Sequence, residues 1–237
     1  MKLSNEQKDL RRKIIEIAYE NHFSHLGSCL SAVDILHAIY QVKRSDEQFV
    51  LSCGHAGVAL YAVLERHGLL STSAMKDLFV HPDRDPANAV SVSTGSLGHG
   101  LPIALGMALA DRTKNVYCVI SDGECAEGSI WESLRVGLEQ KAGNLKIVIN
   151  ANGWGAYAPI SLPLLLNRIR GFGYKAKVMD GHNVRKLVQS LAARTVDRPL
   201  IVFAKTTVEH LPFLKGQDAH YYTMTAEDFA LAKEIFR

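Results

Sequence analysis

The chain has 237 residues, of which 47% are hydrophobic and 22% are charged, and its net charge is +3. Such a composition is typical of an ordinary globular protein and excludes a disordered or strongly basic chain. Lysine and arginine form no long block, and no apolar run approaches the roughly 20 residues of a membrane helix. We therefore expect no nucleic-acid partner and no membrane partner.

No linker, internal repeat or low-complexity stretch divides the sequence, so we expect residues 1–237 to form a single domain. The four cysteines, Cys29, Cys53, Cys118 and Cys125, show no C-x-x-C spacing. This pattern favours free thiols in a reducing compartment, and we expect a cytoplasmic protein.

In chain order, the first expected helix begins after Ser4, which opens a capping-box pattern, and reaches about Glu20. A loop over 21–29 separates it from a second helix that starts near Ser31. The loop places His25 ahead of a helix N-terminus, where a polar ligand can be met.

The next segment joins a strand, a turn and a helix. Residues 48–51 are predicted as a strand that leads through Gly54-His55 into a helix through Leu64. This turn places an imidazole at the carboxyl end of the strand. Residues 81–86, which begin with His81, are expected to form an irregular loop because of their prolines.

A glycine-rich run at 93–100 precedes an expected helix over 101–112, and its three glycines permit close approach of a ligand. The remaining elements alternate regularly: strands are predicted over 115–120, 145–149, 175–179 and 200–204, and helices near 130–138, 162–170, 184–192 and from about 226. This alternation predicts an α/β fold with a doubly wound, mostly parallel sheet flanked by helices.

Polar residues follow two of these strands. Asp122-Gly123 comes directly after the strand at 115–120, and Asn152 follows the strand at 145–149. In open parallel sheets, ligands bind beyond the carboxyl ends of the strands. One carboxylate and one amide oxygen suit a hard cation such as Mg²⁺, which is commonly shared with phosphate groups. The alternative is an Asp122 that only caps a turn.

Asp122-Gly123 with Asn152 resembles the thiamine-diphosphate fingerprint, although Ser121 and Ala151 replace its first glycine and first asparagine. Further motifs resemble, in the same order, the N-terminal part of a transketolase: Ser24-His25-Leu26-Gly27-Ser28, Leu51-Ser52-Cys53-Gly54-His55-Ala56, His81-Pro82-Asp83, Thr94-Gly95-Ser96-Leu97-Gly98-His99-Gly100, Asp122-Gly123-Glu124-Cys125-Ala126-Glu127-Gly128 with Trp131-Glu132, and Asp180-Gly181-His182. The resemblance covers nearly the whole chain and implies the diphosphate-binding (PP) domain of the thiamine-diphosphate fold.

The resemblance implies thiamine diphosphate and Mg²⁺ as cofactors. The metal ligands that it implies are Asp122, Asn152 and the main-chain carbonyl of Trp154. The cofactor-binding residues that it implies are Gly95, Ser96, Leu97, Gly123, Glu124, Asn152 and His55.

The same resemblance implies catalytic histidines around the substrate, namely His25, His55, His81 and His220. Imidazole titrates near neutral pH, so it can donate and accept protons as substrate hydroxyls react. Glu127 is implied as a member of a carboxylate network at a subunit interface, linked to the glutamate that activates the cofactor. The alternative for Glu127 is a helix-start carboxylate favoured by the helix dipole.

Full transketolases are much longer, so the resemblance implies a split enzyme. This chain would be the α subunit of a two-component transketolase, in an expected α₂β₂ assembly. A separate C-terminal, pyrimidine-binding subunit would supply the activating glutamate. The enzyme would transfer a two-carbon ketol (glycolaldehyde) unit from a ketose donor to an aldose or related acceptor, each a sugar or sugar phosphate.

Three alternatives stay open. The α subunit of a 2-oxoacid dehydrogenase or decarboxylase shares the fingerprint but usually lacks the Gly-His-Ala and His-Pro-Asp loops. The departures at Ser96, Ser121 and Ala151 leave room for a non-catalytic, cofactor-binding regulatory subunit. Together with His99 and Tyr221, they also fit an unusual acceptor, such as a carrier-bound group in a specialised pathway.

Overall fold

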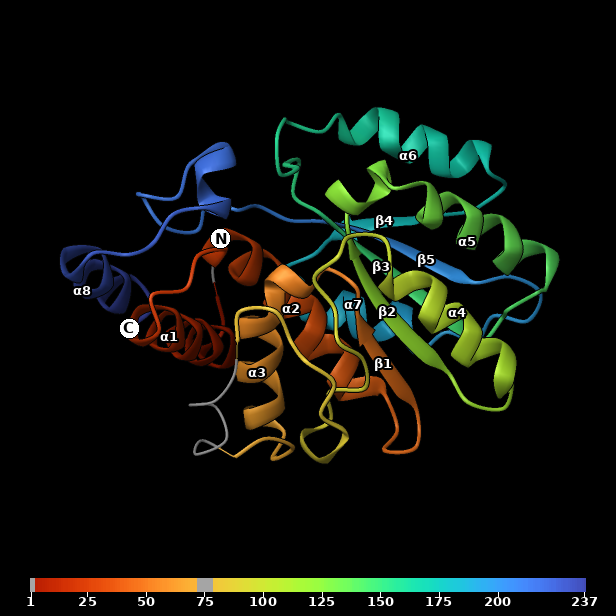
Figure 1. Ribbon diagram of the computed structural model, residues 1–237, viewed down its shortest axis with the longest axis horizontal. Helices are drawn as coiled ribbons and strands as arrows, with labels where there is room; N and C mark the ends of the chain where they lie inside the picture. The colour runs from red at the N-terminus through yellow and green to blue at the C-terminus, as the bar shows by residue number, and fades with distance from the viewer. Residues whose placement is uncertain (1–2, 72–78) are drawn as a thin grey trace.

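A single parallel sheet organises the computed structural model, which describes residues 3–71 and 79–237 (Figure 1). Within these ranges the strands are β1 (Gln48–Leu51), β2 (Val116–Ser121), β3 (Leu145–Ala151), β4 (Lys177–Asp180) and β5 (Leu200–Lys205). They pair in the order β1-β2-β3-β5-β4, and each of these pairs is parallel. The expected α/β fold with a mostly parallel sheet is confirmed.

Helices lie on both sides of the sheet (Figure 1). One side carries α1 (Asn5–Glu20), α2 (Leu26–Val42), α3 (Gly57–Arg66) and α7 (Val184–Leu191). The other side carries α4 (Gly100–Ala110), α5 (Gly128–Glu139) and α6 (Leu162–Gly171), while α8 (Ala226–Ile235) packs on α1.

The side chains of β2 divide alternately between two apolar cores. Tyr117 and Val119 join the core beside α2, whereas Cys118 and Ile120 join the core beside α4. A strand buried on both faces needs apolar side chains at every position, which is why this segment reads as a continuous apolar run. Its polar residues begin only where the strand ends, and this arrangement positions the site described below.

The second helix begins at Leu26, so the expected start near Ser31 is wrong. Residues 26–40 are all buried, and this packing overrides the weak helix preference of Gly27 and Ser28. An added Cβ on Gly27 would lie 2.6 Å from the Cβ of Ala219. His25 is consequently the N-cap residue, with its backbone in the left-handed region at φ 64°. The other predicted elements occur with small differences at their ends.

The four cysteines are free, as the spacing predicts, and all four are buried. Burial raises the pKa of Cys53 well above its ordinary value, so its thiol stays protonated at neutral pH. In the part of the chain that the structure describes, each helix is too short or too polar to cross a bilayer.

We expect Gly54→Ala to lower the free energy of unfolding by about 1–3 kcal/mol. An added Cβ would lie 2.5 Å from the carbonyl carbon of Thr94 and 2.6 Å from the nitrogen of Gly95, so two backbone segments would have to separate. Urea unfolding measures the change. The matched control is Gly106→Ala in α4, where an added Cβ meets nothing within 4 Å and alanine favours the helix. Equal destabilisation of both variants would contradict the steric argument.

Candidate functional site

A cavity of about 160 Å³ lies at the carboxyl ends of the strands. Loops from both halves of the chain line it, and most of the predicted site residues are among them. The predicted residues in its lining are His25, His55, His81, Gly95, Leu97, Gly123, Trp154 and His220. The structure therefore brings together positions that are far apart in the sequence.

Four imidazoles converge on this cavity. The ring centroid of His25 lies 5.6 Å from that of His55, 5.8 Å from that of His81 and 6.4 Å from that of His220. The main-chain N–H of His25 donates to the carbonyl of His220 at 2.9 Å, which joins two segments at opposite ends of the chain. The four predicted histidines therefore lie close together around the cavity, while their catalytic role stays a prediction.

Burial favours the neutral form of three of these imidazoles, those of His25, His55 and His220. It lowers the pKa of His25 to about 4 and that of His55 to about 3, and the neighbouring imidazoles lower both further. Burial also lowers the pKa of His220. The Nδ1 atoms of His25 and His220 are buried and lack a hydrogen-bond partner within the described ranges. Such atoms are available to a bound ligand.

We expect His55 to make the fold less stable as the pH falls below 6.5. An unfolded histidine binds a proton near pH 6.5, whereas folded His55 does so only near pH 3. The unfolded chain therefore binds more protons between these values, and the free energy of unfolding falls as the pH falls. His55→Gln should reduce this slope by up to about 1.4 kcal/mol per pH unit, measured by urea unfolding at several pH values. An unchanged slope would contradict the burial of a neutral His55.

Asp122 is a buried carboxylate, 2% exposed, directly after β2. Its Oδ2 accepts from the Gly153 N–H at 2.6 Å and its Oδ1 from the Gly123 N–H at 3.0 Å. Burial raises its pKa to about 7, and no lysine, arginine or histidine in 3–71 or 79–237 forms an ion pair with it. A buried carboxylate without a counter-charge favours a bound cation.

The loop after β3, whose Gly153 N–H bonds to Asp122, carries two further candidate oxygens. The Oδ1 of Asn152 accepts from the Trp154 N–H at 2.9 Å. A Cβ built on Gly123 would lie 3.9 Å from the carbonyl oxygen of Trp154, so that oxygen faces the Asp122-Gly123 turn. Carboxylate, amide and main-chain oxygens are the donors that Mg²⁺ prefers, and these residues fit a metal-bound diphosphate.

The described residues contain no cluster of three or more histidine, cysteine, aspartate or glutamate side chains that could hold a metal ion. A site built on Asp122, Asn152 and Trp154 does not need such a cluster, because it uses one carboxylate with two neutral oxygens. Metal ligation by these residues stays a prediction.

Five predicted site residues lie outside the lining of the cavity, namely the candidate metal ligands Asp122 and Asn152 described above and also Ser96, Glu124 and Glu127. Glu124 is completely buried, whereas Ser96 and Glu127 are exposed. Glu127 is the N-cap residue of α5 and lies against Gly98, where an added Cβ would be 2.7 Å from its own Cβ. This position is compatible with both of its predicted roles, the interface network and the helix start.

The sequence did not predict that Tyr221 closes one side of the cavity. Its hydroxyl donates to the carbonyl of Ala156 at 2.8 Å, and the side-chain amide of Gln217 donates to the same carbonyl at 2.8 Å. These bonds join the segment that carries His220 to the loop after β3. Tyr221 stood out only as a departure from the family motif, and no local pattern indicates a contact with Ala156.

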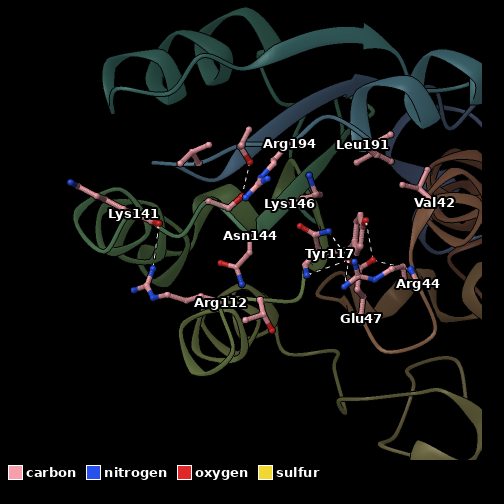
Figure 2. A pocket seen from close by; sticks show the side chains of 16 residues that line it. Val42, Arg44, Glu47, Arg112, Tyr117, Lys141, Asn144, Lys146, Leu191 and Arg194 are labelled. Atoms are coloured by element: carbon pink, nitrogen blue, oxygen red, sulfur yellow. Dashed lines mark hydrogen bonds and ion pairs between the residues drawn. The ribbon is translucent and has the colours of Figure 1, made fainter.

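A larger hollow of about 620 Å³ lies at the opposite edge of the sheet, and Figure 2 shows the basic side chains around it. The ammonium of Lys146 donates to the carbonyl of Ala193 beyond α7 at 2.6 Å, and Arg112 donates to that of Gln140 beyond α5 at 3.0 Å. Helices of an α/β fold run opposite to the strands, so their C-terminal carbonyls gather at this edge. Cations offset their dipoles, which gives the basic lining a structural role.

Comparison with known proteins agrees with this geometry. A family model described as 1-deoxy-D-xylulose-5-phosphate synthase matches residues 1–170. Transketolase of Homo sapiens is 32% identical over an alignment of 230 positions, and the match covers 86% of this chain and 37% of that protein. The chain belongs to the transketolase family. Its predicted family membership is confirmed, and it spans about 37% of the length of the curated transketolases that it matches.

A shorter member of the transketolase family matches the chain almost end to end. It is the A subunit of the apulose-4-phosphate transketolase of Phocaeicola vulgatus, which is 29% identical over an alignment of 252 positions, and the match covers 92% of this chain and 88% of that protein. Among solved structures, transketolase from Campylobacter jejuni has a TM-score of 0.83 at 22% identity and covers 98% of this chain and 42% of its own. The structural likeness shows the fold.

Proposed function

We propose that this chain is the α subunit of a two-component transketolase that uses thiamine diphosphate and Mg²⁺. The enzyme would transfer a two-carbon ketol unit from a ketose donor to an aldose or related acceptor. The observation that carries the proposal is one cavity where the four imidazoles meet the Asp122 and Asn152 loops. The relative of matching length, which is named as one subunit of a transketolase, supports it.

Asp122, Asn152 and the carbonyl of Trp154 would hold Mg²⁺ and, through it, the diphosphate. The turn at Gly123 would lie against the diphosphate, because its lack of a side chain leaves the backbone accessible. When bound, thiamine diphosphate supplies the electron sink for cleavage and formation of the carbon–carbon bond beside the ketose carbonyl.

The histidines would bind the substrate hydroxyls and move their protons. A neutral imidazole offers one donor nitrogen and one acceptor nitrogen. Because burial holds the pKa of His25 and His55 low, both rings keep this paired capacity at neutral pH. The unpartnered Nδ1 atoms of His25 and His220 are the atoms from which we expect the substrate contacts.

The partner that we propose is a separate C-terminal, pyrimidine-binding subunit that supplies the activating glutamate, in an α₂β₂ assembly. The exposed Glu127 at the start of α5 is the residue that we expect to meet it. We also propose that residues 1–237 form a single domain, because one sheet carries both apolar cores. The free thiols favour a cytoplasmic location.

Mixing this chain with the partner subunit, Mg²⁺ and thiamine diphosphate tests the proposal. We expect cleavage of a ketose donor only when both subunits are present. Turnover by this chain alone would contradict the split arrangement. Calorimetry that detects no Mg²⁺-dependent binding of the cofactor with the partner present would favour a regulatory subunit.

A second candidate is a 2-oxoacid-using thiamine enzyme. The observation that favours it is the match to the family model described as 1-deoxy-D-xylulose-5-phosphate synthase. Comparing pyruvate with a ketose phosphate as the donor separates the two candidates, because only one should be consumed in the presence of an aldose acceptor.

A further inference from the structure

Glu124 is a buried carboxylate that lies behind the cavity. It follows Gly123 in a short 3-10 turn and has no exposed surface. Its Oε1 accepts from the hydroxyl of Ser52 at 2.6 Å and from the N–H of Gly98 at 2.9 Å. Its Oε2 accepts from the N–H of Ser121 at 3.0 Å. Both oxygens are therefore engaged by donors of the protein.

These three donors belong to three different loops at the carboxyl edge of the sheet. Ser52 precedes the turn that carries His55, Gly98 ends the loop that supplies the cavity wall, and Ser121 directly precedes Asp122. The loops also touch one another, since an added Cβ on Gly100 would lie 2.5 Å from the Cα of Ser52. Glu124 thus bonds to each loop that shapes this side of the cavity.

The carboxylate is held by hydrogen bonds and not by a counter-charge. Burial raises the pKa of Glu124, and the three donors oppose that effect. A buried carboxylate that loses its donors is strongly destabilised. Movement of any of the three loops away from Glu124 would therefore cost free energy.

We infer that Glu124 is a positioning residue, whose buried carboxylate fixes the spacing of the His55 turn, the Gly95–Gly98 loop and the Asp122 turn. The inference rests on the proposed function, because it takes this cavity as the binding site of thiamine diphosphate. The chain thereby places its metal ligand and its imidazole relative to each other before either meets the cofactor.

The decisive variant is Glu124→Gln, which keeps the size of the side chain. A glutamine has one acceptor oxygen and one donor amide group. If the amide replaces Oε1, it faces the N–H of Gly98, and if it replaces Oε2, it faces the N–H of Ser121. Either orientation sets a donor against a buried donor, and at least one loop is released.

The matched control is Glu47→Gln at the opposite edge of the sheet. Glu47 is also a buried carboxylate, 4% exposed, and accepts from the side-chain amide of Asn115 at 2.6 Å and from the N–H of Arg44 at 2.8 Å. The two variants make the same chemical change in similar burial, so a general loss of stability should appear in both.

Hydrogen exchange of the chain without cofactor gives the first readout. In Glu124→Gln we expect amides in at least one of the segments around Gly98 and Ser121 to exchange about tenfold faster or more, the scale of one hydrogen bond to a charged group. Glu47→Gln should not change these segments. Unchanged exchange in the segments around Ser52, Gly98 and Ser121, or equal acceleration in both variants, would overturn the inference.

Cofactor affinity gives the second readout. With Mg²⁺ and the partner subunit present, we expect Glu124→Gln to raise the dissociation constant of thiamine diphosphate about tenfold, while Glu47→Gln leaves it unchanged. If the native protein binds no cofactor, the proposed function fails, and the exchange result still decides the role of Glu124. Should Glu124→Gln not fold, Ser52→Ala removes one donor and should accelerate exchange in the Gly98 segment as well as its own.

Discussion

Replacing Asp122 with asparagine is expected to weaken Mg²⁺-dependent binding of thiamine diphosphate by about 100-fold or more. Asparagine offers one neutral oxygen in place of a carboxylate, so the cation loses its only charged ligand among the proposed donors. Calorimetry with the partner subunit present measures the change. The effect should vanish in the absence of Mg²⁺, because the charge acts on the metal.

The pH dependence of Mg²⁺ binding provides an independent test of Asp122. Burial raises its pKa to about 7, so a proton competes with the metal for the carboxylate below neutral pH. We expect the apparent Mg²⁺ affinity of the native protein to fall about tenfold per pH unit below pH 7. The free energy of unfolding of the metal-free protein depends on pH in the opposite direction. The raised pKa of Asp122 stabilises the fold at low pH, and this contribution is lost as the pH rises through 7.

Asp180→Asn is the matched control, since Asp180 ends β4 and is exposed. The same substitution at another strand end should leave both the cofactor affinity and its pH dependence as in the native protein. An Asp122→Asn protein with native affinity, or with a native pH profile for Mg²⁺ binding, would contradict the assignment of Asp122 as a ligand.

The sequence was sufficient to locate the edge of the sheet where the cavity lies, because buried parallel strands leave a simple pattern. β2 and β3 lie in the middle of the sheet and are apolar over most of their length. Apart from Lys146 near the start of β3, their polar residues gather at the carboxyl ends. Asp122 and Asn152 follow from that rule together with the fingerprint. The apolar runs in the sequence agree with the central position of β2 and β3, because a central strand is buried on both faces.

The roles of Glu124 and Tyr221 could not be read in the same way. Glu124 is two residues from Asp122, yet its carboxylate bonds to Ser52, which is 72 residues away in the sequence. Tyr221 reaches Ala156 across 65 residues. Neither contact has a local signature, because each depends on how separate loops pack at the edge of the sheet.

The conformation of His25 was hidden for a related reason. The loop pattern placed an imidazole near a ligand but gave no sign of the left-handed backbone at φ 64°. That conformation results from the early start of α2, which the close packing of Gly27 on Ala219 allows. The resemblance predicted that His25 belongs to the site, whereas its backbone conformation depends on tertiary packing.

His25→Asn is expected to lower kcat/KM by about 100-fold or more, the usual contribution of a positioned acid–base group. Asparagine tolerates the left-handed region better than other side chains, so the backbone at the N-cap of α2 should be kept. Steady-state kinetics with the partner subunit measures the loss. The affinity for thiamine diphosphate should stay near the native value, because the ring of His25 is not among the proposed metal ligands.

His22→Asn is the control that separates chemistry from backbone strain. His22 is exposed and has φ 53°, so the same substitution is made in a similar backbone conformation away from the cavity. It should leave kcat/KM unchanged. Equal losses in the two variants would point to the backbone and against a role for the His25 ring. A parallel fall of cofactor affinity and kcat/KM in His25→Asn alone would instead place that ring against the cofactor, because a group that acts only on the substrate leaves cofactor binding intact.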